Sequence, residues 1–218
     1  MSRTEALAGL PAAPNSRRLI PAALSRAAGA ILAALLLPLL VATASAADIQ
    51  PGTYMFVLDR TMARVVVPGQ KGNLAADMNF QLGELTFDKG GMIVNARADI
   101  DTGSVSTKNA SSVSTLKGRY GFDSSRYPFA RFESTTGSVQ GDRVVMTGLL
   151  TIKDVTRPVE LTGTLLRSNP RRVVMRLEGM IDRTAFGITA GRPVYGKDAK
   201  IILRIVALRE RGGRMRQG

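Results

Sequence analysis

Two stretches of the sequence decide the fold class of this chain: Y-G-F-D-S-S-R-Y-P-F-A-R-F-E-S at residues 120–134 and G-L-L-T-I-K-D-V-T-R-P-V-E-L-T-G-T-L at residues 148–165. Turns at residues 139–143 and 153–158 separate three segments, and in each segment apolar or small residues alternate with polar ones. Alternation with a period of two is typical of strands with one buried face. The stretch therefore predicts an antiparallel meander, whose inward residues are Ala130, Phe132 and Ser134, then Val144, Met146, Gly148, Leu150 and Ile152, then Val159, Leu161, Gly163 and Leu165.

The same pattern extends over much of the chain. We expect further strands at residues 74–87, 92–100, 172–181 and 200–208, and either two strands or one bent strand across residues 53–67. In the strand at 92–100, Val94, Ala96 and Ala98 are expected to face inward. Residues 103–126 interrupt the alternation and are expected to form a long loop with a short helix near residues 110–117. About eight strands separated by turns predict an all-β fold, either a closed antiparallel barrel or a sandwich.

The chain begins with a segment typical of an export signal. Arg17, Arg18 and Arg26 precede an apolar run at residues 27–41, and Ala44-Ser45-Ala46 is a small-residue cleavage site. We expect residues 1–46 to be a signal peptide cleaved near Ala46-Ala47, residues 47–208 to form one β-domain, and residues 209–218 to be a disordered basic tail. The twin arginines leave both the general and the twin-arginine export routes open.

Composition argues against several kinds of chemistry. The chain has no cysteine and no histidine, so it lacks thiolate chemistry, the commonest general base and the commonest metal ligand. Asp99 and Asp101 are two positions apart, but nothing in the sequence places them as a catalytic pair. We predict no catalytic residue, no metal site and no cofactor, and expect the chain not to be an enzyme.

The charge of the chain indicates partners outside nucleic acid. Removing the four arginines and one glutamate of residues 1–46 leaves a net charge of +10. An exported basic protein meets anionic lipid headgroups, so weak contact with an anionic membrane surface is expected. Nucleic-acid binding is not predicted, because no aromatic residues interleave the basic runs as base stacking requires.

The order of short motifs resembles that of the YceI-like family, the bacterial polyisoprenoid-binding proteins with a lipocalin-like barrel. The matching pieces are Phe122-Asp123, Tyr127-Pro128-x-Ala130-x-Phe132, Gly148-x-Leu150-Thr151-Ile152, Val155-Thr156-x-Pro158-Val159-x-Leu161, Asp101-Thr102-x-Ser104-Val105-x-Thr107 and Arg183-Thr184-Ala185-Phe186-Gly187-Ile188. The resemblance implies an eight-stranded lipocalin-like barrel in the periplasm that holds an isoprenoid or quinone-like lipid. The family's loop histidines are absent, so a headgroup would need Arg, Lys, Tyr or backbone groups.

Small residues at inward positions leave open whether the barrel is hollow or whether large residues opposite fill it. The resemblance favours a cavity. Its expected apolar lining consists of Val94, Phe132, Met146, Gly148, Leu150, Leu161, Gly163, Met175, Leu177 and Phe186. Phe122, Tyr127 and Phe129 lie in or beside the irregular segment and are candidates for a mouth, although each of these residues also fits ordinary packing.

Two functions therefore compete. The first is a periplasmic binding or carrier protein that holds an isoprenoid or other apolar lipid chain in the barrel. The alternative is a barrel without a carrier role, which acts as an adaptor for the envelope or a partner protein through its basic surface. The oligomeric state stays open.

Overall fold

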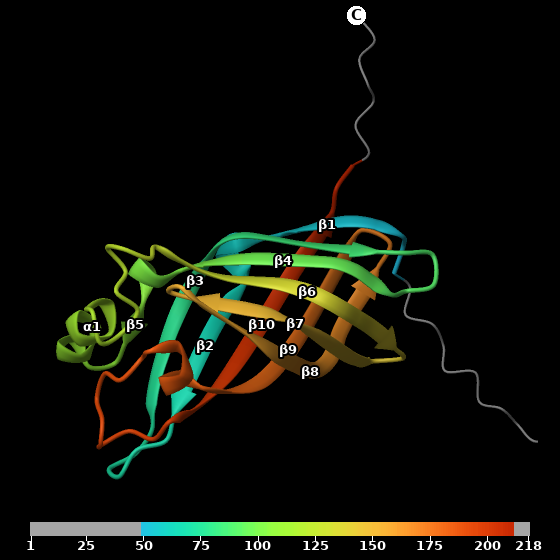
Figure 1. Ribbon diagram of the computed structural model, residues 1–218. Coiled ribbons are helices and arrows are strands. Elements are labelled where there is room, and N and C mark those ends of the chain that lie inside the picture. The colour runs from blue at the N-terminus through green and yellow to red at the C-terminus, as the bar shows by residue number, and fades with distance from the viewer. Residues whose placement is uncertain (1–48, 212–218) are drawn as a thin grey trace, which may run out of the picture. The chain divides into compact units, whose positions relative to one another are not determined.

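The computed structural model describes residues 49–211. They form a closed antiparallel β-barrel with eight strand positions around its wall (Figure 1). The strands are β1 (Gly52–Phe56), β2 (Met62–Val67), β3 (Leu74–Phe87), β4 (Ile93–Asp101), β5 (Ser106–Thr107), β6 (Phe129–Gln140), β7 (Arg143–Ile152), β8 (Val155–Asn169), β9 (Arg172–Asp182) and β10 (Asp198–Arg209). The helix α1 (Ala110–Lys117) and the 3₁₀ turns η1 (Leu58–Arg60), η2 (Thr102–Ser104) and η3 (Arg183–Phe186) connect them.

Closure comes from the pairing of β9 with β10. The sheet runs β10-β2-β3-β4-β6-β7-β8-β9, and the ladder from Asp182↔Asp198 to Arg172↔Leu208 joins its two ends. Closure pairs every strand of the barrel wall in residues 49–211 on both sides, and only the two-residue β5, which pairs with β3 alone, remains an edge. The prediction of an all-β antiparallel barrel is confirmed, and the sandwich is excluded.

One strand position of the barrel wall is shared by β1 and β2, which η1 separates. Both strands pair with β3 on one side and with β10 on the other. At the interruption Thr61 replaces a backbone partner of β10, because its hydroxyl accepts the Val206 N–H at 3.1 Å and donates to the Val206 carbonyl at 3.2 Å. The N–H of Val57 also donates to the Val206 carbonyl. Of the two alternatives for residues 53–67, the two-strand one is therefore observed, and the two strands share one position in the barrel wall.

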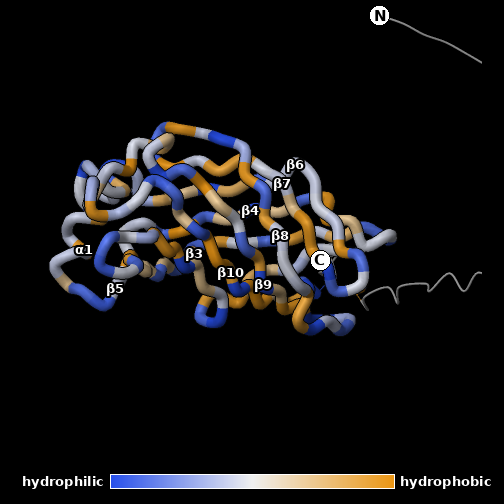
Figure 2. The backbone as a smooth tube through the Cα atoms, turned by 90° about the horizontal axis from the view of Figure 1, so that it is seen from below, coloured by the Kyte–Doolittle hydropathy of each residue, from blue (hydrophilic) through white to orange (hydrophobic). Residues whose placement is uncertain are grey.

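Inward positions of the strands form one apolar core. Hydrophobic and hydrophilic residues alternate along the tube of the barrel wall (Figure 2). Tyr54, Met175 and Leu177 are fully buried, and Tyr54 packs edge-on against Phe87 with ring centroids 5.4 Å apart. Edge-to-face aromatic pairs of this kind add to the stabilisation from buried area.

The prediction that Val94 faces inward is wrong. Ile93 is 2% exposed and Val94 is 60% exposed. Phe87 pairs with Ile93 and Thr86 pairs with Asn95, so Val94 has no partner in the β3–β4 ladder. A bulge inserts one residue and reverses the alternation on its far side. Ala96 and Ala98, beyond the bulge, point inward as expected.

The irregular segment forms a cap at one end of the barrel. Its helix α1 occupies the expected residues, and Asn109 caps it by accepting the Ser111 N–H. The loop after η3 lies at the same end (Figure 1). The last strand continues through Arg209, one residue into the expected tail. The expected signal peptide and residues 212–218 lie outside the described residues. No helix among residues 49–211 is long and apolar enough to span a membrane.

Candidate ligand-binding site

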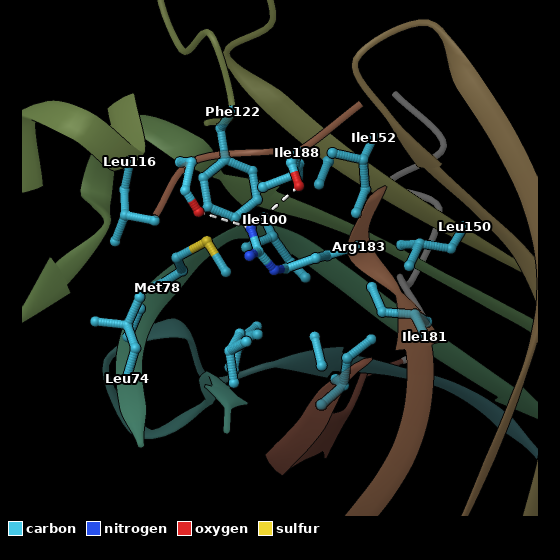
Figure 3. A pocket seen from close by; sticks show the side chains of 18 residues that line it. Leu74, Met78, Ile100, Leu116, Phe122, Leu150, Ile152, Ile181, Arg183 and Ile188 are labelled. Atoms are coloured by element: carbon cyan, nitrogen blue, oxygen red, sulfur yellow. Dashed lines mark hydrogen bonds between the residues drawn. The ribbon is translucent and has the colours of Figure 1, made fainter. Parts of the chain in front are cut away.

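The barrel interior contains two apolar chambers. The first, here called the capped chamber, lies beneath α1 and the loop after η3. The volume within which the centre of a water molecule could lie is about 80 Å³. Figure 3 shows its side chains converging from several strands and from the cap. Its walls are Ala63, Val65, Val67, Leu74, Ala76, Met78, Ile100, Leu116, Phe122, Ala130, Leu150, Ile152, Ile181, Arg183, Ile188, Ala190, Ala199 and Ile201.

The second, here called the inner chamber, has a corresponding volume of about 50 Å³. It is lined by Phe56, Phe80, Leu85, Ala96, Arg97, Ala98, Ile100, Phe132, Met146, Leu150, Val159, Leu161, Leu177, Ile201, Leu203 and Ile205. Ile100, Leu150 and Ile201 belong to both chambers and form a waist between them. A buried water needs two to four polar partners. These walls offer almost none, so the space suits an apolar chain.

Arg183 is the polar exception in the capped chamber (Figure 3). Its side chain is buried and donates four hydrogen bonds, all to backbone carbonyls: Nε to Gly196, Nη1 to Ile188 and Ala190, and Nη2 to Tyr195. Burial lowers the pKa of the guanidinium, although an arginine stays charged in proteins. Four carbonyl dipoles therefore solvate this charge, and Arg183 holds the loop of residues 187–197 over the barrel end.

A second cation joins three parts of the cap. Lys153, in the β7–β8 turn, donates from Nζ to the carbonyls of Arg119 and Gly187, each at 3.0 Å. Burial lowers the pKa of this ammonium. The N–H groups of Thr189 and Ala190 both donate to the Tyr120 carbonyl at 2.8 Å. The segment after α1 and the loop after η3 are thus joined by main-chain hydrogen bonds, and the Lys153 side chain joins the β7–β8 turn to both.

Five of the residues expected to line a cavity meet at the inner chamber: Phe132, Met146, Leu150, Leu161 and Leu177. Met175 and Phe186 are buried in the core but border neither chamber. Val94 lies on the outside, as described above. Of the expected mouth residues, Phe122 lines the capped chamber. Tyr127 instead reaches outward to Asp154, with 3.4 Å between Oη and Oδ2, and Phe129 is half-buried at the start of β6.

Gly148 and Gly163 do not leave the open volume expected of them. A β-carbon on Gly148 would meet the Phe132 ring at 2.6 Å and the Glu133 carbonyl. One on Gly163 would collide with the backbone of Arg176 in the neighbouring strand. The expectation that they line a cavity is wrong, because a facing ring and a facing strand take the space. Glycine is needed at both positions for close approach.

Several lining residues were missed from sequence. Ile201, Leu203 and Ile205 follow the alternation of the last strand, so the pattern used for the meander would have found them. Ile188 and Arg183 lie in the connection between β9 and β10, where no periodicity exists to indicate direction.

The acidic residues of β4 are engaged separately. Asp99 Oδ1 lies 3.3 Å from Arg131 Nε, whereas the Asp101 carboxylate accepts the Gly103 N–H and caps η2. Among residues 49–211 no three His, Cys, Asp or Glu side chains gather as a metal site would require. The candidate functional site is therefore the apolar interior of the barrel.

A closed antiparallel barrel with a short helix and an apolar interior is the architecture of lipocalin-like barrels. A family model, the YceI-like domain, matches residues 56–207, and the chain belongs to this family. The resemblance inferred from the motifs is confirmed.

Relatives agree in sequence. The UPF0312 protein plu2095 of Photorhabdus laumondii is 28% identical over 135 residues, which cover 59% of this chain and 70% of that protein. Protein YceI of Salmonella arizonae is 27% identical over 135 residues, covering 59% of this chain and 71% of that protein.

Solved structures agree in fold. BcnA of Burkholderia cenocepacia superposes with a TM-score of 0.60 at 20% identity over 69% of this chain and 98% of that one. A polyisoprenoid binding domain from Saccharophagus degradans, implicated in plant cell wall breakdown, gives 0.56 at 12% identity over 74% of this chain and 100% of that one.

Proposed function

We propose that this protein binds an isoprenoid or another apolar lipid chain in its two chambers and carries it in the periplasm, after cleavage near Ala46-Ala47. The observation that carries the proposal is the lining. Apart from Arg183 and Arg97, every residue that borders either chamber is apolar. Burial of each methylene group contributes about 0.8 kcal/mol, so a chain that occupies both chambers would gain a large gross binding energy.

The waist sets the path of such a chain. A linear ligand in both chambers passes Ile100, Leu150 and Ile201. Met78 and Met146 are flexible side chains that can adjust to it. The similarity in fold to the polyisoprenoid binding domain of Saccharophagus degradans supports an isoprenoid as the ligand class. A binding role of this kind needs no catalytic residue.

The test compares two neighbours on β7 that face opposite sides. Leu150 is 5% exposed and lines both chambers, whereas Leu149 is 43% exposed on the outer wall. The protein, exported to a bacterial periplasm and purified, is analysed by native mass spectrometry before and after addition of polyprenols or quinones. We expect a bound lipid, and at least a tenfold weaker uptake by Leu150→Trp but not by Leu149→Trp.

Circular dichroism and thermal unfolding verify that both variants keep the barrel. An unmodified protein that arrives empty and takes up none of these lipids contradicts the proposal. Equal uptake by the two tryptophan variants would place the ligand elsewhere. If Leu150→Trp does not fold, Ile201→Phe provides the same block from β10.

A further inference from the structure

Apolar and cationic side chains gather on the outer wall of the barrel around η1. Met55 pairs with Leu208, and Met62 pairs with Arg204, across the ladders to β10. Paired residues of adjacent strands point to the same side of a sheet, so these side chains share a side, and all are exposed. Leu58, in η1 between the two strands, is exposed as well. We call this surface the η1 face; it comprises Met55, Leu58, Met62 and Leu208 with Arg60, Arg172 and Arg204.

A depression in the η1 face collects its three arginines. It offers about 780 Å³ of room for water-sized spheres, and Leu58 and Met62 border it too. Arg172 Nε is buried and has no hydrogen-bond partner among the described residues. Arg204 uses Nη1 on the Arg60 carbonyl, so most of its donors remain for a ligand. Guanidinium groups bind phosphate oxygens in a bidentate fork, so this depression has the chemistry of a phosphate site.

The carboxylates that border the depression do not cancel this charge. Asp59 lies 4.0 Å from Arg60 Nε with both side chains exposed, a separation at which an ion pair is weak. Asp101 accepts the Gly103 N–H as the cap of η2. The three arginines therefore outnumber the two acids, and Arg172 and Arg204 form no ion pair with an acid in the described part of the chain.

We propose that the η1 face docks on bilayers that contain anionic lipids. The arginines bind lipid phosphates, and Met55, Leu58, Met62 and Leu208 enter the acyl boundary. Exposed apolar side chains beside basic ones are typical of surfaces that bind anionic membranes. In the sequence, Arg209, Arg211, Arg214 and Arg216 directly follow Leu208, with Glu210 as the single acid among them. Charge complementarity thus favours an anionic membrane as the occupant. Docking requires no lipid in the chambers, so it stands independently of the proposed carrier role.

The experiment uses the chain from Ala47 to Gly218, which contains every residue of the closed barrel. Its sedimentation with phosphatidylglycerol–phosphatidylcholine vesicles is compared with that on phosphatidylcholine alone. We expect binding to the anionic vesicles that weakens in high salt, since salt screens exposed charges. The triple variant Arg60→Gln, Arg172→Gln, Arg204→Gln should bind at least about tenfold more weakly, because each arginine near an anionic surface contributes to binding.

A matched variant removes the same charge elsewhere. Arg126→Gln, Arg143→Gln, Arg167→Gln changes three exposed arginines outside the η1 face and should keep most of the binding. Likewise Met55→Ser, Leu58→Ser, Met62→Ser should weaken binding, and Leu149→Ser, Leu166→Ser, Met180→Ser should not. Equal losses in the paired variants would show that only net charge or general hydrophobicity acts, and would overturn the proposal. Unchanged binding by the η1-face variants would overturn it as well.

The absence of cysteine permits a second readout that leaves the arginines intact. An environment-sensitive dye on Leu58→Cys should shift to the blue when anionic vesicles are added, whereas the same dye on Leu166→Cys should not. A shift at Leu166→Cys alone would place the membrane on another face. Retention of polyprenol by the triple-arginine variant separates loss of docking from loss of the carrier function.

Discussion

Arg183 and Ala190 are joined by a 2.8 Å hydrogen bond from the guanidinium Nη1 to the carbonyl oxygen, which fixes the loop after η3 over the capped chamber. The same guanidinium bonds the carbonyls of Ile188, Tyr195 and Gly196. Removal of a donor from buried acceptors costs about 1–3 kcal/mol for each group left unpaired. Arg183 is therefore a main support of the cap, beside the contacts of Lys153 and of the Tyr120 carbonyl.

Arg183→Met should lower the free energy of unfolding by about 3 kcal/mol or more, because several buried carbonyls lose their donor at once. Hydrogen exchange of residues 187–197 should accelerate more than that of β6 and β7. Urea unfolding and exchange mass spectrometry measure these effects. Arg167→Met, at an exposed position, is the control and should change stability by less than about 0.5 kcal/mol. A stable variant with a slowly exchanging loop would contradict this role.

Thr61→Val should lower the free energy of unfolding by about 2 kcal/mol, because it weakens the junction between β1, β2 and β10. The Thr61 hydroxyl replaces a ladder partner for both the N–H and the carbonyl of Val206, and it is buried. Valine keeps the shape but offers neither a donor nor an acceptor. Thr164→Val, at an exposed position on β8, serves as the comparison in thermal or urea unfolding. Equal stability of the two variants would mean that Val57 alone repairs the ladder.

Gly163→Ala should prevent folding or cost about 3 kcal/mol or more, because its methyl group would collide with the Arg176 backbone and backbone cannot move aside as a flexible side chain can. At Gly90 the nearest atom to an added β-carbon is Asp88 Oδ1 at 3.4 Å, an ordinary contact. Gly90→Ala should therefore be nearly neutral. Denaturant midpoints of the two variants provide the measurement, and a fully stable Gly163→Ala would show that β8 and β9 can separate.

Acid should weaken the β2–β3 contact. Arg64 donates to both carboxylate oxygens of Asp77, at 2.6 and 2.8 Å, and this hydrogen-bonded pair lowers the pKa of Asp77. A carboxyl with a lowered folded pKa stabilises the fold fully above its unfolded value of about 3.9, and this contribution disappears as pH falls through the folded pKa.

The pair is partly exposed, so its contribution is about 1 kcal/mol at most. Asp77→Asn should flatten the decline of unfolding free energy below about pH 4. Asp142→Asn, which removes an exposed carboxylate outside this ion pair, is the matched comparison. Urea titrations at several pH values test this. A decline of the same steepness in Asp77→Asn would assign the acid sensitivity to other carboxylates.

Much of the fold was predictable from the sequence, because a period of two survives wherever a strand separates an apolar core from water. The meander of β6, β7 and β8 and five residues of the inner chamber follow from that pattern, and α1 lies where the pattern is interrupted. Val94 was misplaced because a bulge is a property of two paired strands, and only the β3–β4 register reveals it. The volume expected at Gly148 and Gly163 was wrong for a similar reason, since the Phe132 ring and the Arg176 backbone that fill it come from other strands or faces.

By itself, the sequence determined the class of the protein: alternating apolar residues predict an all-β fold, and the order of its motifs indicates the family. Only the tertiary structure decided where the interior remains open. Volume depends on which side chains face one another across the barrel, and this requires the closed register of β9 with β10. It also decided the roles of the cations, because Arg183 lies inside against backbone carbonyls while Arg172 and Arg204 gather outside at η1. Residues far apart in sequence create both environments, so no local pattern of the sequence contains them.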